Sequence, residues 1–509
     1  MSALNNCHGH RILFFQPEKA VINITMLQKL LLHKMDTMKF IVLLVLSISI
    51  ISIPCLLLSA TKNHTHLTTT KSSLEHLLDS FLSLIPKFSS QICNENSGIE
   101  VDSDVQGPLF IYPPQYGAEK YLLRKATLLT NKSCDLYSHT SAAEVLRQIE
   151  KADLIQNSSF KYLKLGGGTP GSSSIPVSFG ADLDFQNRKQ YFKISDGMEL
   201  PCGFANYNSP GFLVSDGDKE AMDKCRGLVV ISAIFGGYDR LRQPKRVRKI
   251  SAENVCFFMF VDNVTLEKLA GHGIEPDKFH KIGVWRIVLV KELPYKEYVM
   301  DGLIPKYLPH RLFPNCMYTI WADAKIQLTV DPLLILENLL IKQKADMALS
   351  RHAYNIHTME EAIFTVRWRK WNKEGVRQQM ENYCADGLQP WNRKKLPYVA
   401  DVGDTALILR KNNLPANLFS CLVFNEIQVF NPRDQLAFAY VRDKMSPKVK
   451  IHMFSVDIFN TITNEYRHFS KPSISSKEHE PGFNQGIFVD QEFTACRSYL
   501  DIMWNTSNK

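Results

Sequence analysis

The sequence predicts an α/β protein with a mainly parallel sheet flanked by helices, carried by a single membrane-spanning segment near the N-terminus. Short apolar runs alternate with helical patterns across residues 202–468. Such alternation is typical of a parallel sheet whose crossover helices cover both faces. Residues 40–60 form an uncharged stretch of 21 residues, which is long enough to cross a membrane as a helix.

Six strands account for the predicted sheet. Continuous apolar runs of this length are typical of strands that are buried on both faces. We expect strands at residues 228–235, 255–261, 285–290, 317–322, 346–350 and 406–409, with a helix at 332–344 before the fifth. Because ligands bind at the carboxyl ends of the strands in such sheets, residues 236–239, Asp262, Asp323, Arg351 and His352 are candidate site residues.

Composition places the rest of the chain among ordinary globular proteins. Hydrophobic residues make up 45% and charged residues 22% of the sequence, which excludes wholesale disorder and fibrous repeats. The net charge of +9 is spread too thinly to define a nucleic-acid-binding protein. Nucleic acid is therefore not an expected partner, and the sequence does not indicate an oligomeric state.

The charges around residues 40–60 predict a type II orientation. Basic residues precede this segment and most of the chain follows it, so the positive-inside rule places residues 61–509 in the lumen. If translation began at Met38, the same run would instead resemble a signal peptide with a cleavage site near Ala60. Five sequons support a lumenal body as candidate N-glycosylation sites: Asn63, Asn131, Asn157, Asn263 and Asn505.

Nine cysteines follow the predicted anchor, and an odd number leaves at least one without a partner in the chain. Cys202 and Cys225 flank a loop-rich stretch, and we expect them to form a disulfide. Cys256 and Cys316 sit inside apolar runs and are expected to be buried thiols.

Changes in composition divide the chain into segments. We expect a cytosolic tail at 1–39, a signal anchor at 40–60, a stem at 61–104, an accessory region with a linker at 105–200, a catalytic domain at 201–470 and a C-terminal tail at 471–509.

The turn after the first strand suits a phosphate-bearing ligand. Gly237 lets the backbone approach a ligand, Tyr238 can stack on a base and Asp239 follows them, although an ordinary tight turn explains the same residues. Neither GxGxxG nor GxxxxGK[ST] is present, so dinucleotide and P-loop sites lose their main support.

The fourth strand ends in IWADAKIQL, residues 320–328. Sugar-nucleotide transferases with a GT-A-like sheet place Asp-x-Asp here, where it holds a divalent cation and the nucleotide diphosphate. Asp323 matches the first acidic position and is the candidate metal ligand. Lys325 stands where the second acid would be; its ammonium cannot bind a metal but can neutralise phosphate, which leaves the divalent cation open as a cofactor. Alternatively, Asp323 caps the following turn.

Further polar residues surround a turn before a late helix. Asp434 can cap that helix or act as a base toward an acceptor hydroxyl, and Arg433 can hold a carboxylate or phosphate. We expect catalytic roles for Asp323, Asp434, Glu426 and His352, and substrate binding by Gly237, Tyr238, Asp239, Lys325, Arg351, Arg433 and Gln435. Six of these are expected to converge on one cleft: Asp323, Lys325, His352, Glu426, Arg433 and Asp434.

Residues 202–469 resemble a plant family that has a glycosyltransferase-like domain. The resemblance rests on CGFANYNSPGF, ISAIFGGYDRLRQP, KYLPHRLFP, IWADAKIQL, ALSRHAYN and NPRDQLAFAYVRDK, and it implies a GT-A-like sheet. The family has two branches, a hexosyltransferase linked to seed mucilage and a turgor-regulation-defect protein described as a Golgi alkaline ceramidase. The end of the domain, VADVGDTALILRKNNLPANLFSCLVFNE, is similar to the second branch.

The resemblance therefore implies a Golgi membrane enzyme that hydrolyses ceramide to sphingosine and fatty acid and acts in turgor regulation. The residue chemistry favours a different reaction, because amide hydrolysis needs an activated nucleophile or a metal-bound water and the sequence shows no zinc triad and no GxSxG. The alternative is a hexosyltransferase that uses a nucleotide sugar and a glycan acceptor in cell-wall polysaccharide synthesis. A further alternative, supported by Lys325, is a non-catalytic binding protein.

Overall fold

The computed structural model describes residues 107–117, 122–126, 141–151, 161–162, 187–194, 198–203, 212–468 and 495–505, with only the backbone of 501–505. The predicted anchor at 40–60 and the sequons at Asn63, Asn131 and Asn157 lie outside these residues. Among the helices that are described, none is both long and apolar enough to span a membrane. Asn263 is exposed, and Asn505 ends the last helix.

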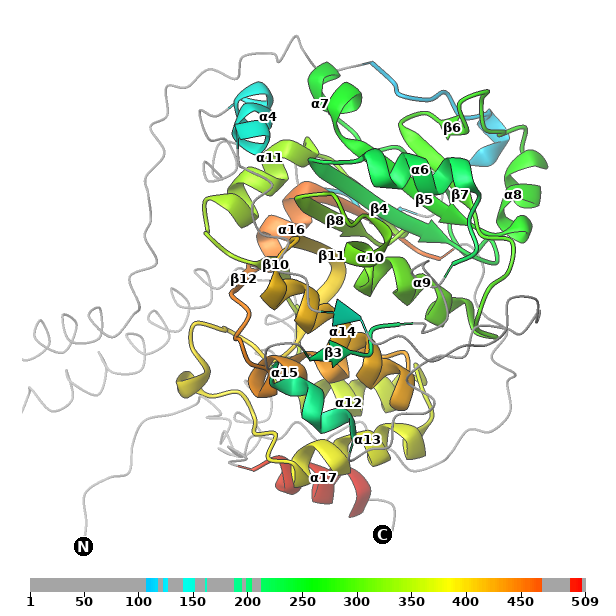
Figure 1. Cartoon of the computed structure of the whole chain (residues 1–509). Helices are drawn as coiled ribbons and strands as arrows, with labels where there is room; N and C mark the ends of the chain where they lie inside the picture. The colour runs from blue at the N-terminus through cyan, green and yellow to red at the C-terminus, as the bar shows by residue number, and fades with distance from the viewer. Residues whose placement is uncertain are drawn as a thin grey trace, which may run out of the picture. The chain divides into compact units, whose positions relative to one another are not determined.

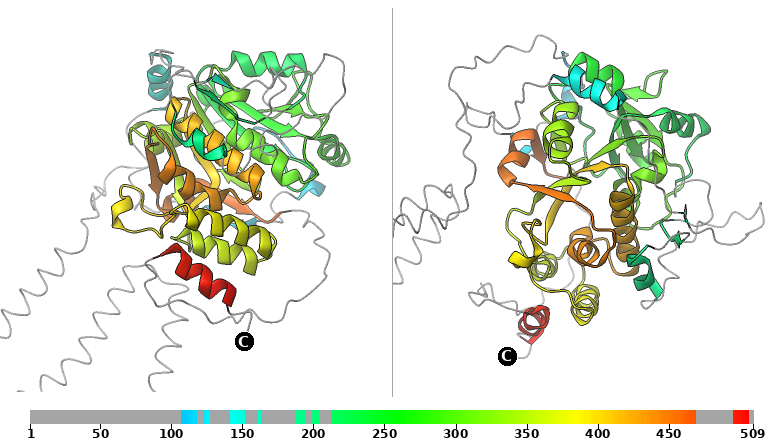
Figure 2. Two further views of the ribbon diagram at one scale, coloured as in Figure 1. Left: turned by 60° about the horizontal axis from the view of Figure 1, so that its bottom comes forward. Right: turned by 60° about the vertical axis from the view of Figure 1, so that its left-hand side comes forward.

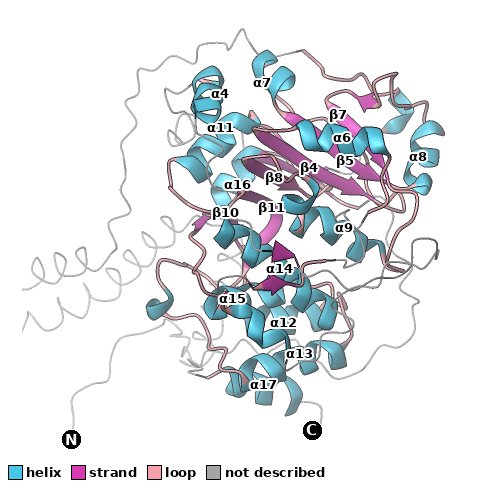
Figure 3. Cartoon of the chain, viewed as in Figure 1, coloured by secondary structure: helices cyan, strands magenta, loops and turns pink. Residues whose placement is uncertain are grey.

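An eight-stranded sheet forms the centre of the described part (Figures 1 and 3), and all six predicted strands belong to it. The strands follow the order β12-β10-β11-β8-β4-β5-β7-β6. In chain order they are β4 (Leu228–Ile234), β5 (Cys256–Val261), β6 (Lys281–Ile282), β7 (Trp285–Leu289), β8 (Tyr318–Ala322), β10 (Met347–Arg351), β11 (Gly403–Lys411) and β12 (Ile451–Phe454).

The sheet is mixed, with four parallel and three antiparallel pairs of neighbouring strands, so the prediction of a mainly parallel sheet is confirmed in part. β4 pairs in parallel with β5 and β8, and β10 pairs in parallel with β12. β11 runs antiparallel to both β8 and β10. An apolar run shows that a strand is buried but not which way it points. As a result, β11 begins at the edge where β8 and β10 end.

Helices cover both faces of this sheet because its strands alternate buried side chains between two cores. In β4, Val229 and Ile231 pack on one face, whereas Leu228 and Val230 pack on the other. The core on the first face is shared by α6 (Asp216–Lys224), α9 (Tyr298–Tyr307), α10 (Pro309–Leu312), α12 (Thr358–Arg367), α14 (Leu414–Val429) and α15 (Asp434–Lys444). α13 (Lys373–Ala385) and α17 (Cys496–Asn505) extend this core by packing on α12 and on each other. The second face is covered by α4 (Ala142–Lys151), α7 (Lys249–Asn254), α8 (Asn263–Ala270), α11 (Pro332–Leu336) and α16 (Val456–Ile462).

Smaller elements complete the described part. The predicted helix at 332–344 is present as α11, continued by a π-helical turn at Glu337–Ile341. A three-stranded sheet joins β1 (Leu122–Arg124), β13 (Thr463–Tyr466) and β9 (Ile326–Leu328), and β2 (Lys161–Tyr162) pairs with β3 (Glu199–Leu200). Short 3-10 turns lie at Pro114–Tyr116, Asn187–Phe192 and Arg393–Lys395.

Within the described residues, three disulfides join segments that are distant in the sequence. They pair Cys202 with Cys421, Cys225 with Cys256, and Cys384 with Cys496. The last bridge ties α17 to α13, and the two helices lie side by side in Figure 2. The predicted Cys202–Cys225 pair was wrong, and Cys256 is not a thiol, because Cys225 precedes β4 and Cys256 opens the neighbouring β5. Cys316 is a buried free thiol, as predicted.

Candidate active site

Asp323 stands directly after β8, on the face of the sheet that α9 covers. Its Oδ1 accepts a hydrogen bond from Trp321 Nε1 at 2.7 Å and lies 3.6 Å from Lys306 Nζ. Its Oδ2 lies 3.7 Å from Lys325 Nζ. The Asp323 N–H donates to Ala406 O of β11 at 2.8 Å. Both carboxylate oxygens therefore face N–H donors or cations, and the backbone at this strand end is fixed.

Lys306, near the end of α9, connects Asp323 to Asp434. Its Nζ lies 2.7 Å from Asp434 Oδ2 and donates to Thr405 Oγ1 at 3.1 Å. The Tyr307 hydroxyl donates to the same Asp434 oxygen at 3.0 Å. Burial alone would raise the pKa of Asp434, but the neighbouring cations, Lys306 first, outweigh it and lower this pKa to about 2. We call Lys306, Asp323, Lys325 and Asp434 the lysine–aspartate cluster.

Carboxylates from three other segments surround Lys325. Burial opposes its charge, but Asp323 and Asp404, followed by Glu465 and Asp239, raise its pKa. Asp404 is half-buried near the start of β11, where the antiparallel direction of that strand places it at the carboxyl edge. Lys325 is therefore held as an ammonium.

A second group, built on α12 and the N-terminus of α15, contains the predicted Arg433 and His352. Arg433 Nη2 lies 3.0 Å from Glu361 Oε1, and His352 Nε2 lies 3.9 Å from Glu361 Oε2. His352 Nδ1 accepts backbone N–H groups, including that of Asn355 at 2.9 Å. Burial lowers the pKa of His352, so its imidazole is neutral at pH 7. Gln435 donates to Gly403 O at 3.0 Å and accepts from Arg433 at 2.9 Å.

The turn after β4 is shaped by two positive-φ glycines, Gly236 at 63° and Gly237 at 61°, a conformation that favours glycine. A Cβ at Gly237 would lie 2.3 Å from Lys268 Cδ. Asp262 accepts from Gly236 N at 3.0 Å while it also caps α8. These bonds hold the backbone of Gly237 and Tyr238 at the carboxyl edge.

Tyr238 and Asp239 follow at this edge. Tyr238 is half-buried, its ring centroid 5.8 Å from that of Tyr298. Both oxygens of Asp239 lie 3.1 Å from His468 Nδ1, and this contact raises the pKa of His468.

Two predicted residues lie apart from the cluster. Glu426 is fully buried within α14, where its Oε1 is 2.6 Å from Arg188 Nε and its Oε2 accepts from Tyr383 at 2.8 Å. The structure therefore does not bring Glu426 to Asp323, because this side chain is one half of a separate buried ion pair. Arg351 ends β10 with an exposed side chain.

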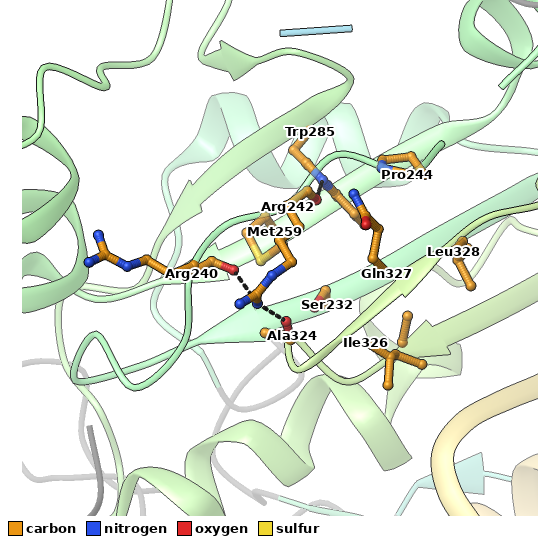
Figure 4. Close-up of a pocket in the computed structure, with 11 residues that line it drawn as sticks. Ser232, Arg240, Arg242, Pro244, Met259, Trp285, Ala324, Ile326, Gln327 and Leu328 are labelled. Carbon is orange, nitrogen blue, oxygen red and sulfur yellow. Dashed lines mark hydrogen bonds between the residues drawn. The ribbon is translucent and has the colours of Figure 1, made fainter. Parts of the chain in front are cut away.

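A small pocket lies on the opposite face of the Asp323 strand end (Figure 4). Ala322 and Ala324, the neighbours of Asp323, line it together with Ser232, Arg240, Arg242, Pro244, Met259, Trp285, Ile326, Gln327 and Leu328. Arg242 reaches into this pocket and donates to Ala324 O and to Arg240 O, each at 3.0 Å. Its guanidinium lies 3.8 Å from the centre of the Tyr466 ring. Arg242 therefore supports the Asp323–Lys325 turn from behind.

Sequence reasoning missed Lys306, Asp404 and Glu361. Lys306 and Glu361 lie within helices whose packing against the sheet no local pattern reports. Asp404 precedes the apolar run at 406–409, whereas ligand-binding residues are expected to follow strands. Strand direction was the missing information.

The donor set around Asp323 does not fit a metal ion held by several protein carboxylates. Among the described residues, one group gathers three potential metal donors within 4.8 Å: Cys202, His310 and Cys421. Two of its sulfurs form a disulfide, so they are not thiolate ligands. The charged partners of Asp323 are the ammonium groups of Lys306 and Lys325, and its closest hydrogen-bond donor is the neutral Trp321 indole N–H.

Comparison with known proteins agrees with this architecture. A family model described as "TOD1/MUCI70, glycosyltransferase-like domain" matches residues 161–468. "Alkaline ceramidase TOD1" of Arabidopsis thaliana is 42% identical over 428 residues, which cover 79% of this chain and 88% of the relative. "Probable hexosyltransferase MUCI70" of the same organism is 38% identical over 275 residues, 53% of this chain and 47% of the relative.

Two solved structures are more distant. The apo form of mouse xyloside xylosyltransferase 1 aligns over 45% of this chain and 85% of its own, with 9% identity and a TM-score of 0.27. The apo WbbM bifunctional glycosyltransferase aligns over 45% and 39%, with 9% identity and a TM-score of 0.24. These scores are too low to support an argument, so the assignment rests on the family model and the relatives. The chain belongs to the TOD1/MUCI70 family and carries its glycosyltransferase-like domain at residues 161–468.

Proposed function

We propose that this protein is a glycosyltransferase that transfers a hexose from a nucleotide-sugar donor to a glycan acceptor. The observation that carries the proposal is the position of Asp323 between Lys306 and Lys325, at the carboxyl edge of a glycosyltransferase-like sheet. In α/β sheets this edge is where ligands bind. Two ammonium groups beside a strand-end carboxylate suit a ligand that gains negative charge as it leaves, as a nucleoside diphosphate does.

Each residue of the site then has a separate role. Lys325 faces the diphosphate, Lys306 holds Asp323 and Asp434 in place, and the Gly237–Tyr238 backbone supports the nucleotide. In the reaction, an acceptor hydroxyl attacks the anomeric carbon, the bond to the diphosphate breaks, and a base takes the hydroxyl proton. Asp434 is a poor base because its pKa is about 2. Asp404, half-buried and close to Lys325, is the better candidate.

Lys306 and Lys325 affect whether the reaction needs a divalent cation. Because the partners of Asp323 are ammonium groups rather than further carboxylates, we infer that the lysines supply the positive charge that a divalent cation provides in an Asp-x-Asp site. Chelation with EDTA should therefore reduce transfer less than twofold, whereas Lys325→Met should reduce it by about a hundredfold or more. Restoration of a chelated, inactive enzyme by Mn²⁺ would contradict this inference.

Ceramide hydrolysis is the second candidate function. One observation favours it: the relative that is 42% identical over most of the chain is named an alkaline ceramidase. The geometry does not supply what amide cleavage requires, since His352, which lies near Glu361, is paired with no serine or cysteine nucleophile among the described contacts. Ceramide hydrolysis therefore ranks below glycosyl transfer as a candidate function.

We also propose a type II Golgi membrane location with a lumenal domain. The three disulfides support a lumenal location, because disulfides persist in oxidising compartments. Protection of the domain from protease in intact vesicles, together with a mobility shift on endoglycosidase treatment, is the expected result. Digestion without detergent would exclude this topology.

One parallel assay tests the reaction. The purified lumenal domain is incubated with a panel of nucleotide sugars plus glycan acceptors and, separately, with ceramide at alkaline pH. We expect release of nucleoside diphosphate that is lost in Asp323→Ala and falls by about a hundredfold in Asp404→Asn. Glu220→Gln, an exposed acid-to-amide change on α6, is the matched control and should be fully active. Release of sphingosine that depends on Asp323, without any sugar transfer, would establish the ceramidase instead.

A further inference from the structure

Two large aromatic side chains stand exposed beside the candidate active site. Tyr354 is 76% exposed and Trp368 is 65% exposed. His352 and Phe364 lie between them: the centroid distances are 6.2 Å for Tyr354–His352, 6.3 Å for His352–Phe364 and 5.7 Å for Phe364–Trp368. We call these four residues the aromatic row. Exposed apolar groups that gather next to a polar site mark a binding surface.

The exposed rings are attached to ordered backbone. The Tyr354 N–H donates to His352 Nδ1 at 3.3 Å. At the other end, the Trp368 N–H donates to Phe364 O at 3.0 Å, and Arg369 turns the chain with a φ of 52°. The Lys370 ammonium lies 4.4 Å from the centre of the Phe364 ring. A surface fixed in this way loses little entropy when a ligand binds.

The row begins at His352, within the group of residues around Glu361 that adjoins the lysine–aspartate cluster. His352 and Arg433 both contact Glu361, and Arg433 directly precedes Asp434 of the lysine–aspartate cluster. The electrostatic neighbours of Lys370 include Arg433, Glu361, Lys325 and Asp404. The row therefore lies on the side of the site where α12 meets α15.

We propose that the aromatic row is the acceptor subsite, on which the pyranose rings of a saccharide chain stack. This proposal rests on the proposed glycosyl transfer. The C–H face of a pyranose matches the negative face of an aromatic ring, while its hydroxyl groups need polar partners such as His352 and Lys370 within the same surface. The two exposed rings, Tyr354 and Trp368, are separated by His352 and Phe364 and suit sugar units at different positions along a chain.

A lipid acyl chain fits this surface less well. Trp368 is followed by Arg369 and Lys370, and all three are exposed. An acyl chain requires a continuous apolar groove to bury its methylene groups, and the charged side chains of Arg369 and Lys370 adjoin the row. A ceramide is therefore an outcome to be tested and not the expected occupant.

Binding and kinetics with matched variants test the subsite. Calorimetric titration of the full lumenal domain uses cellohexaose, xylohexaose and hexagalacturonate as neutral and anionic probes. At least one of these saccharides should bind to the wild type. Its affinity should be about tenfold lower for Tyr354→Ala and for Trp368→Ala, whereas Trp368→Phe should retain most of the affinity. Phe279→Ala, a 61% exposed aromatic at a different surface, should bind normally. With an active acceptor, the acceptor KM should rise while the nucleotide-sugar KM stays constant.

The outcomes separate this proposal from the reaction itself. If saccharides bind in a Trp368-dependent way but the protein shows no transferase activity, the subsite proposal stands and the proposed glycosyl transfer is rejected. If sugar transfer is unchanged in both alanine variants, the proposed glycosyl transfer stands and the subsite proposal is rejected. Failure of the wild type to bind any probe, or Trp368-dependent binding of ceramide vesicles alone, overturns the saccharide proposal.

Discussion

Lys306 is the residue on which the candidate site depends most. Its side chain is 8% exposed and lies between two carboxylates, 2.7 Å from Asp434 and 3.6 Å from Asp323. A buried carboxylate remains charged only if a cation or donors compensate it. Lys306 therefore does two things at once: it keeps Asp434 ionised inside the helical layer and orients Asp323 at the edge of the sheet.

Replacement of Lys306 by methionine should destabilise the fold by about 3–5 kcal/mol at pH 7, because it leaves Asp434 buried without its main cation. Urea unfolding at pH 7 measures this loss. Lys306→Met combined with Asp434→Asn should recover a large part of it, since no uncompensated charge then remains. If the double variant is as unstable as the single one, the loss comes from packing and not from charge.

At the scale of single residues, the sequence identifies site residues that follow strands more readily than site residues that lie within helices. Asp323, Lys325, Arg433 and His352 were identified because they stand at strand ends or at a helix start. Glu426 was selected by its proximity to Arg433 in the sequence, yet the intervening helix end directs it to Arg188. Glu426 lies inside α14, whereas Arg433 stands seven residues later, beyond the end of that helix at Val429, so no helical periodicity places the two side chains on one face.

At the scale of elements, α9 connects two unusual ionisable groups. Lys306 near its C-terminus reaches the active edge, and Asp301 near its start is completely buried. Asp301 Oδ1 accepts from Tyr295 N at 3.1 Å, while its Oδ2 has no hydrogen-bond partner in the described part of the chain. Burial raises the pKa of Asp301 from 3.8 to about 7.

This shift gives a pH dependence with a definite sign. A folded-state pKa above the unfolded value means that ionisation opposes folding, so stability should fall as the pH rises from about 4 to about 7 and then level off. Asp301→Asn keeps the acceptor for Tyr295 but cannot ionise. We expect the variant to match wild type at pH 4 and to be more stable by up to a few kcal/mol at pH 8.

Thermal or urea unfolding across this pH range measures the effect. The control is Asp277→Asn, an exposed change that leaves Asp301 intact. Parallel stability curves for wild type and Asp301→Asn would show that the Asp301 carboxyl is not responsible.

The elements themselves were largely predictable, whereas their directions and partners were not. Apolar runs located six strands because burial on both faces leaves a clear pattern in sequence. The antiparallel direction of β11 left no such pattern, because an apolar run indicates burial but not the direction of its strand. That one direction decides whether Asp404 or Lys411 lies at the active edge, and so it changes the list of site residues.

At the scale of the molecule, the described part of the chain is held together by contacts that no local pattern reveals. Specific motifs across more than half of the chain allowed the family to be recognised, but the family resemblance gave no disulfide pairing. Cys202 and Cys421 are 219 residues apart, Cys384 and Cys496 are 112 apart, and Cys225 and Cys256 are 31 apart. Such pairs depend on the order of the strands and on how the helices pack.

The disulfides offer a test of this global architecture. A cross-link stabilises mainly by restricting the unfolded chain, and the effect grows slowly with loop length. Removal of Cys202–Cys421 by a double alanine substitution should cost about 5 kcal/mol, and removal of Cys225–Cys256 about 4 kcal/mol. Each double variant deletes two sulfur atoms, so the difference between the two losses reports the length of the closed loop. Chemical unfolding of both variants and the wild type, purified from an oxidising host, provides the measurement. The pairing of Cys202 with Cys421 would be contradicted if this double variant were as stable as the wild type, or if mass analysis of the intact protein placed either cysteine in a different bridge.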